Sequence, residues 1–145
     1  MTADNPFADC PVIDVYSRAE AIDDGVLVDV TAAAVDAGHP RAVPVVITRA
    51  LFDLVDLDGP EAWRQRRRDR GESTSGRMHD LLWMALLALR RGLADPAERR
   101  EAETGGTLYA AFGVIMPGPG RGRLRQLLVA FNRLEGLTVM LPEDR

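Results

Sequence analysis

The densest group of chemically competent side chains in the sequence is a run of arginines that follows Trp63. The run consists of Arg64, Arg66, Arg67, Arg68 and Arg70, five guanidinium groups within seven residues. Guanidinium groups match the geometry of phosphate oxygens, so the run is a candidate phosphate-binding surface. Trp63 beside it is a candidate anchor for a protein partner, because tryptophan is favoured at interface hot spots.

A second charged group lies near the N-terminus and contains Arg18, Asp24 and Asp29. Asp29 stands inside the apolar run Val26–Val30, where a buried carboxylate is costly unless it is paired. We expect it either to pair with an arginine, Arg18 or Arg77, or to cap the helix that follows it. A carboxylate pair could also hold Mg²⁺, although a hydrolytic site needs more acids and a positioned base.

Histidine and cysteine are too scarce for the common metal sites. The sequence has only His39, His79 and Cys10, which cannot form a zinc finger, an iron–sulfur site or a three-histidine centre. Neighbouring residues on a helix point about 100° apart, so Asp80 is not expected to orient His79. Every basic residue is arginine, which excludes Schiff-base lysine chemistry. We therefore assign no catalytic residue, no metal and no cofactor.

The composition and the charge of the sequence disfavour nucleic acid and membranes as partners. The 145 residues carry a net charge of −4 and a pI near 5.2, whereas an autonomous nucleic-acid binder is more often basic. The charge is uneven: residues 1–60 contain 11 acids and 3 arginines, and residues 61–100 contain 6 acids and 10 arginines. The sequence has no signal-peptide pattern and no apolar run long enough for a membrane span. A single cysteine fits a reducing compartment, so we expect a cytoplasmic protein.

Short elements are expected to position these residues in the first half of the chain. Ser17 and Glu20 have the spacing of a capping box, which predicts a helix that ends before Gly25. Thr31 and Thr48 have the residue type of helix caps. The apolar and β-branched patterns predict strands at 12–16, 26–30 and 45–47 and helices at 32–37, 48–55 and 61–70.

The second half of the chain is expected to supply a central helix and a small sheet. After a loop at 71–76, a helix from Arg77 to Arg91 is apolar around most of its surface, and Trp83 is expected in the core. A short charged helix begins at Asp95. Strands at 108–116, 124–131 and 137–141 with turn-rich links predict a three-stranded antiparallel meander. The fold class is therefore α+β: a mainly antiparallel sheet on a buried helix, as one domain over residues 12–145 after a tail at 1–11.

Three sequence blocks resemble a family of small uncharacterised bacterial proteins carried on plasmids, phages and other mobile elements. They are YSRAEAIDDGVLVDV from Tyr16, RMHDLLWM from Arg77 and VMLPED from Val139. His79 stands where the family pattern has tryptophan, and residues 93–137 match poorly. The resemblance implies the following signature residues: Tyr16, Arg18, Asp24, Gly25, Asp29, Arg77, Asp80 and Trp83.

These observations favour a non-catalytic binding protein of a mobile element that acts on another protein or on a second copy of itself. Interference with a host factor is one form of this hypothesis. A nucleic-acid accessory protein that uses the arginine run at 64–70 is the first alternative. An enzyme with a site built from Arg18, Asp24, Asp29 and His79 is the second, and it requires these side chains to converge in one pocket.

Overall fold

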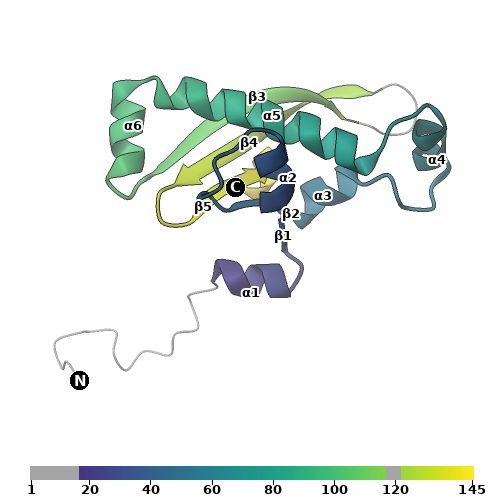
Figure 1. Cartoon of the computed structure of the whole chain (residues 1–145), viewed down its shortest axis with the longest axis horizontal. Coiled ribbons are helices and arrows are strands. Elements are labelled where there is room, and N and C mark those ends of the chain that lie inside the picture. The colour runs from purple at the N-terminus through teal and green to yellow at the C-terminus, as the bar shows by residue number, and fades with distance from the viewer. Residues whose placement is uncertain (1–16, 117–121) are drawn as a thin grey trace.

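The computed structural model of the chain is a five-stranded sheet with its longest helix and several shorter ones packed on one face, while the first helix lies apart from them (Figure 1). It describes residues 17–116 and 122–145; the expected tail at 1–11, the expected strand at 12–16 and the turn around Pro117–Gly120 lie outside these ranges. The helices are α1 (Arg18–Asp23), α2 (Thr31–Asp36), α3 (Arg49–Val55), α4 (Ala62–Asp69), α5 (Thr74–Leu93) and α6 (Pro96–Glu103). The strands are β1 (Leu27–Asp29), β2 (Val45–Thr48), β3 (Thr107–Met116), β4 (Arg123–Asn132) and β5 (Gly136–Met140), and a short 3₁₀ helix, η1, spans Pro142–Asp144.

The sheet has the order β1-β2-β5-β4-β3, and its C-terminal half is the predicted meander. Strands β3, β4 and β5 pair antiparallel in sequence order, and β1 pairs antiparallel with β2. The two halves join through β2 and β5, which run parallel, with Val45 opposite Leu137 and Ile47 opposite Val139. The mixed α+β fold and the mainly antiparallel sheet are therefore confirmed.

The core lies between the sheet and the long helix α5. Alternate residues of β3 face the helices, so that Leu108, Phe112 and Met116 are buried against α5 and α6. The facing side of α5 contributes buried residues at helical spacing, such as Leu82 and Leu89. Within the described ranges no helix is both long enough and apolar enough to span a bilayer.

Helix α5 is longer than the sequence pattern predicted, and its solvent side is different. It begins at Thr74, because the Ser73 hydroxyl accepts a hydrogen bond from the Gly76 N–H at 3.0 Å. The expected loop at 71–76 therefore ends three residues earlier than predicted, where local capping outweighs the glycine content. The prediction that Trp83 lies in the core is wrong, since 43% of its surface is exposed. The apolar stripe of α5 is broad but does not surround the helix.

The N-terminal elements follow the predicted order with one change in capping. Ser17 caps α1 by accepting from the Glu20 N–H, and Gly25 ends it with a φ of +78°. Thr31 does not cap α2; it is the first residue of the helix, and the Asp29 carboxylate accepts hydrogen bonds from its N–H and hydroxyl at 2.9 and 2.7 Å. Asp29 thus does the capping that the pattern assigned to Thr31, which is one of the two roles proposed for it.

Candidate binding groove

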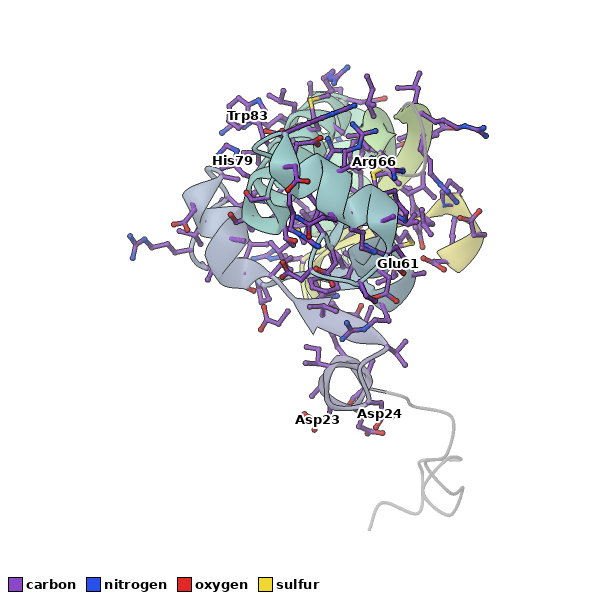
Figure 2. The ribbon with its side chains drawn as sticks, turned by 90° about the vertical axis from the view of Figure 1, so that its right-hand side faces the viewer. Asp23, Asp24, Glu61, Arg66, His79 and Trp83 are labelled. Carbon is purple, nitrogen blue, oxygen red and sulfur yellow. The ribbon has the colours of Figure 1, made fainter. Side chains whose placement is uncertain are left out.

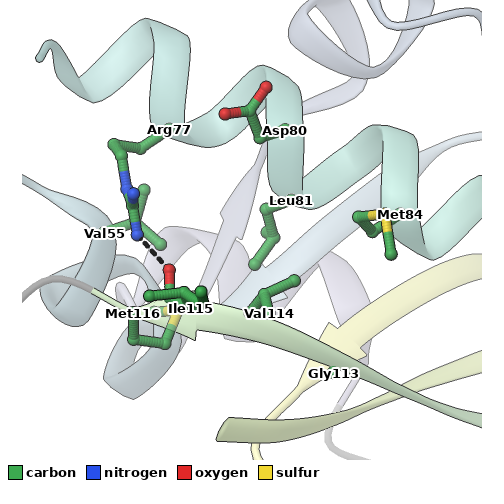
Figure 3. Close-up of a pocket in the computed structure, with 9 residues that line it drawn as sticks. All are labelled: Val55, Arg77, Asp80, Leu81, Met84, Gly113, Val114, Ile115 and Met116. Atoms are coloured by element: carbon green, nitrogen blue, oxygen red, sulfur yellow. Dashed lines mark hydrogen bonds between the residues drawn. The ribbon is translucent and has the colours of Figure 1, made fainter. Parts of the chain in front are cut away.

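A groove opens between helix α5 and the outer strand β3, with a volume of about 310 Å³ (Figure 3). Its lining residues are Val55, Arg77, Asp80, Leu81, Met84 and the β3 segment Gly113–Met116. Apolar side chains form most of the wall, while Arg77 and Asp80 project from the helix above it. This combination is typical of a binding site in which apolar contact supplies affinity and a few polar groups fix orientation.

The helical repeat explains why α5 contributes its residues to the groove. Arg77, Leu81 and Met84 are three or four residues apart, so they project from one side of the helix toward β3, while Asp80 beside Leu81 points away from the strand (Figure 3). All four belong to the RMHDLLWM block that carries the family resemblance. Sequence reasoning named Arg77 and Asp80 but did not bring them together with β3, because only the tertiary packing places that strand beneath α5.

Arg77 closes one end of the groove. Its guanidinium donates to the carbonyl oxygen of Ile115 on β3, and Figure 3 shows this contact crossing from helix to strand. It also lies 3.4 Å from the Glu72 carboxylate, which is itself 3.3 Å from the Arg67 guanidinium. The Arg77 and Arg67 side chains are only 22% and 16% exposed, so solvent screens this network less than it screens a surface ion pair.

The arginine run forms helix α4, and much of it is occupied with local contacts. Arg64 pairs with Glu61 at 2.6 Å, donates to the Asp53 and Asp56 carbonyls and lies over the half-buried Trp63 ring at 4.4 Å. Arg68 donates to Gln65 at 2.8 Å and to the Gly59 carbonyl at 3.3 Å. These contacts fix α4 against the preceding loop.

Arg66 and Arg70 differ from the other arginines of the run because their side chains are exposed. In Figure 2 the Arg66 side chain lies on the same side of the molecule as Glu61, which precedes α4. The Arg67 guanidinium reaches the start of β4, since a Cβ atom added to Gly122 would lie 3.9 Å from it. The basic helix is therefore next to the end of the β3–β4 hairpin where Arg77 closes the groove.

The N-terminal signature residues lie away from the groove. Arg18 donates to the Thr138 hydroxyl at 2.8 Å and to the Leu137 carbonyl, which ties α1 to β5. Burial lowers the pKa of Arg18, against the opposing influence of Glu135 and Asp29. Tyr16 lies outside the described residues, and Asp24 and Gly25 form the end of α1.

Asp29 is exposed, so the expectation of a buried carboxylate is wrong. It lies at the end of the edge strand β1, where solvent reaches it. Hydrogen bonds from the Thr31 hydroxyl and N–H lower the pKa of Asp29, and the charge of Arg18 adds to this effect. Arg77 is not its partner, because that side chain is held by Glu72 and Ile115.

The residues of the enzyme hypothesis do not converge in one pocket. Figure 2 shows Asp24 on α1 at one end of the molecule and His79 on α5 at the other. The His79 Nδ1 lies 3.8 Å from an Asp80 oxygen, which is too long for a hydrogen bond. His39 is buried, and its Nε2 lies 2.8 Å from the Leu82 carbonyl. Among the described residues, no three acids, histidines or cysteines gather as metal ligands.

A feature that sequence reasoning missed is the free edge of β3. No strand of the described ranges lies beyond it, and its ten residues, TLYAAFGVIM, include neither a charge nor a proline. On the face away from the helices, Tyr109 and Ile115 are 41% and 62% exposed. The absence of charged residues from this strand was the available signal in the sequence. An uncharged strand is equally compatible with a position inside the sheet, so the signal is ambiguous when the order of the strands is unknown.

Comparison with known proteins places the chain in a family. No curated protein and no solved structure matches it significantly. A family model matches residues 3–100, a range that holds α1 to α5, β1 and β2 and ends within α6. Three of the five strands, β3 to β5, follow the matched range. The chain belongs to the family of unknown function DUF6573.

Proposed function

We propose that this chain is a non-catalytic binding protein that takes an extended segment of another protein along the free edge of β3. The observation that carries the proposal is the groove between α5 and that edge. The mobile-element context and a cytoplasmic location belong to the same proposal, and the sequence-block resemblance and the lone cysteine support them.

The backbone of β3 supports strand addition. In an antiparallel pair, the N–H and C=O groups of every other residue point to the neighbouring strand and those between point outward. A ten-residue edge therefore presents a row of backbone groups that a second extended chain can pair with. Proteins usually protect such an edge with lysine, proline or a bulge, and β3 has neither charge nor proline.

The groove adds side-chain selectivity to this backbone pairing. Its volume of about 310 Å³ is at the small end of ligand sites and suits a single large side chain better than a cofactor. Leu81, Met84 and Val114 offer that side chain an apolar environment. Burying one large aliphatic side chain contributes about 1.5–3 kcal/mol, enough to select among segments that pair equally well through their backbones.

An affinity purification tests the proposal. The tagged protein and a Met84→Glu variant are incubated with an extract of a bacterial host, with half of each sample treated with nuclease. Met84→Glu places a charge in the groove, so it should lose a protein partner that the wild type retains after nuclease treatment. Leu134→Glu is the control, because Leu134 is 86% exposed and lies outside the groove. Equal capture by wild type and Met84→Glu would contradict the proposal.

The same affinity purification also tests the alternative that the protein binds nucleic acid through the arginine run. Arg66→Glu combined with Arg70→Glu reverses two exposed charges without breaking the contacts of Arg64, Arg67 and Arg68. Recovery of nucleic acid by the wild type, and not by this double variant, would favour phosphate binding over the groove.

A further inference from the structure

One conceivable occupant of the groove and of the β3 edge is β3 of a second copy. The way in which the side chains of β3 alternate between the two faces of the sheet argues against this occupant. Two antiparallel copies of β3 would share one continuous sheet, with both helical layers on the same face. The residues of the added strand on the helical side would then be Leu108, Ala110, Phe112, Val114 and Met116 of the second copy. Leu108, Phe112 and Met116 are 0%, 6% and 6% exposed in their own core, Ala110 is small, and Val114 lines the groove of its own copy, so none of them offers a large free side chain to the neighbouring groove.

The occupant therefore needs inward-facing side chains that are free, as those of an extended segment of another protein are. Val114 faces the helices and lines the groove, so the side chain opposite Val114 on an added strand would enter it. Leu81 and Met84 bound the same space from α5 (Figure 3). A leucine or a similarly large apolar residue is the anchor that this environment accepts.

Charge distinguishes the two ends of the groove. At the Met116 end, Arg77 holds the Ile115 carbonyl, so strand pairing is interrupted there and the next residues of a bound segment meet the guanidinium. Glu72 lies between Arg77 and Arg67, which leaves this three-residue cluster with a net positive charge. Exposed Arg66 and Arg70 extend the basic surface along α4. Among the described residues that line the groove, Asp80 is the only acid, and it projects into solvent with 81% of its side chain exposed.

We propose that the partner segment combines an apolar anchor beside Val114 with acidic side chains that contact Arg77 and the basic surface of α4. This inference rests on the proposed function and adds the chemical class of the partner. It also gives the arginine run a role that is compatible with the net charge of −4. A local basic surface can select an acidic peptide even though the protein that carries the surface is acidic as a whole.

Model peptides provide the test. The probe is the fluorescently labelled, acetylated and amidated peptide EETVTLTVTEE, whose glutamates at both ends serve either strand direction. Companion peptides replace the glutamates with lysine or the central leucine with alanine. Fluorescence anisotropy at physiological salt should show the glutamate peptide binding at least about tenfold more tightly than the lysine peptide, and more tightly than the alanine peptide.

Variants assign the preference to Arg77. Arg77→Gln should remove most of the preference for glutamate over lysine, whereas Arg91→Gln should preserve it. Arg91 is an exposed arginine of the same helix and does not line the groove. Circular dichroism and melting curves verify that both variants are folded. If Arg77→Gln destabilises the fold, Arg66→Glu with Arg70→Glu measures the basic surface, and the double variant should invert the preference.

The outcomes separate this inference from the proposed function. Leucine-dependent binding without a charge preference would overturn the acidic partner and leave strand addition at the groove intact. Failure of all peptides would overturn both. Binding of a labelled single-stranded oligonucleotide that competes with the glutamate peptide and needs Arg66 and Arg70 would assign the basic surface to phosphate. A concentration-dependent dimer in analytical ultracentrifugation that Met84→Glu abolishes would make a second copy the occupant.

Discussion

Gly136 is the first residue of β5, directly after the tight link from β4, and its backbone has a φ of +95°. A Cβ atom at this position would lie 2.4 Å from the Pro44 carbonyl oxygen, which belongs to the segment before β2. Two features of this position therefore favour glycine over other residues: the backbone is left-handed, and the two halves of the sheet approach each other closely. Its neighbour Leu137 donates to the same Pro44 carbonyl at 2.9 Å.

Gly136→Ala is expected to destabilise the protein more than Gly105→Ala. Both glycines have a φ of +95°, so each substitution carries the left-handed cost of about 1–2 kcal/mol. Only Gly136 adds a clash with backbone, because nothing lies within 4 Å of the corresponding position at Gly105. Urea unfolding of the two variants measures the difference, and equal losses would show that the Pro44 contact relaxes freely.

His39 makes the stability of the fold depend on pH. Burial beneath α5 lowers the pKa of His39 below its ordinary value of 6.5, although the hydrogen bond to Leu82 opposes this shift. The folded protein thus keeps a neutral ring while the unfolded chain takes up a proton as the pH falls through 6.5. The free energy of unfolding should therefore be largest above this pH and decrease below it.

Substitution isolates the contribution of His39. His39→Gln is less stable at every pH because packing is lost, but its melting temperature should fall less than that of the wild type between about pH 7 and pH 5. His79→Gln is the matched control, because it replaces the other histidine of the chain with the same residue at a position that is 54% exposed. Parallel slopes for the wild type and His39→Gln would contradict the assignment.

At the scale of elements, the start of helix α5 depends on a capping residue, Ser73. The sequence did not predict this cap, because the glycines around Ser73 are typical of a loop. The Ser73 hydroxyl accepts from the Gly76 N–H at 3.0 Å and lies 3.3 Å from the Ser75 hydroxyl. Ser73→Ala should cost about 1 kcal/mol of stability because one N–H at the helix start loses its partner. Ser75→Ala should cost much less, since Ser75 is an exposed residue within the first turn. Thermal unfolding of both variants measures the difference, and similar losses would show that Ser73 is not the effective cap.

Element types were predictable from the sequence because their signals are local. Ser17, Thr48 and Asp95 each accept a hydrogen bond from a backbone N–H at the start of their helices, as their residue types indicate. The alternation of β3 to β5 and their short links also define the meander. The burial of Asp29 and Trp83 was predicted wrongly, because it depends on whether a neighbouring element covers that side of the strand or helix.

The candidate site was only partly predictable, for a related reason. The sequence singled out Arg77 and Asp80 through the RMHDLLWM block, but the other wall of the groove is β3, more than 30 residues away in the chain. That β3 is an edge follows from the order of the strands. The order in turn depends on the parallel pairing of β2 with β5, which leaves no periodic pattern in the sequence.

At the scale of the whole molecule, the family-matched range is not a structural unit by itself. Residues 3–100 contain β1 and β2, yet β2 pairs on its other side with β5, which lies beyond that range. The buried residues Leu108, Leu127, Val129, Leu137 and Val139 also lie beyond it. A substantial part of the core against which the matched elements pack is therefore supplied by the last third of the chain.

A fragment of residues 1–100 is accordingly expected not to fold. It would expose one side of β2 and the sheet-facing side of α5, and the two strands that the structure describes within it, β1 and β2, are too short to form an independent sheet. Circular dichroism should show little cooperative thermal transition for the fragment, in contrast to the full chain. A cooperative transition at a similar temperature would mean that β3 to β5 are dispensable for the fold.

The position of β5 has a consequence for how the protein is made. The ribosome adds this strand after the other four, yet it occupies the middle of the sheet, between β2 and β4. During translation, β2 therefore lacks its partner β5 during the time in which the uncharged strand β3 has already been synthesised. A nascent chain that stalls before Gly136 would present several unpaired strand edges to chaperones and proteases. The described sheet is thus complete only once β5 has emerged, which favours the removal of products truncated before this strand over their persistence.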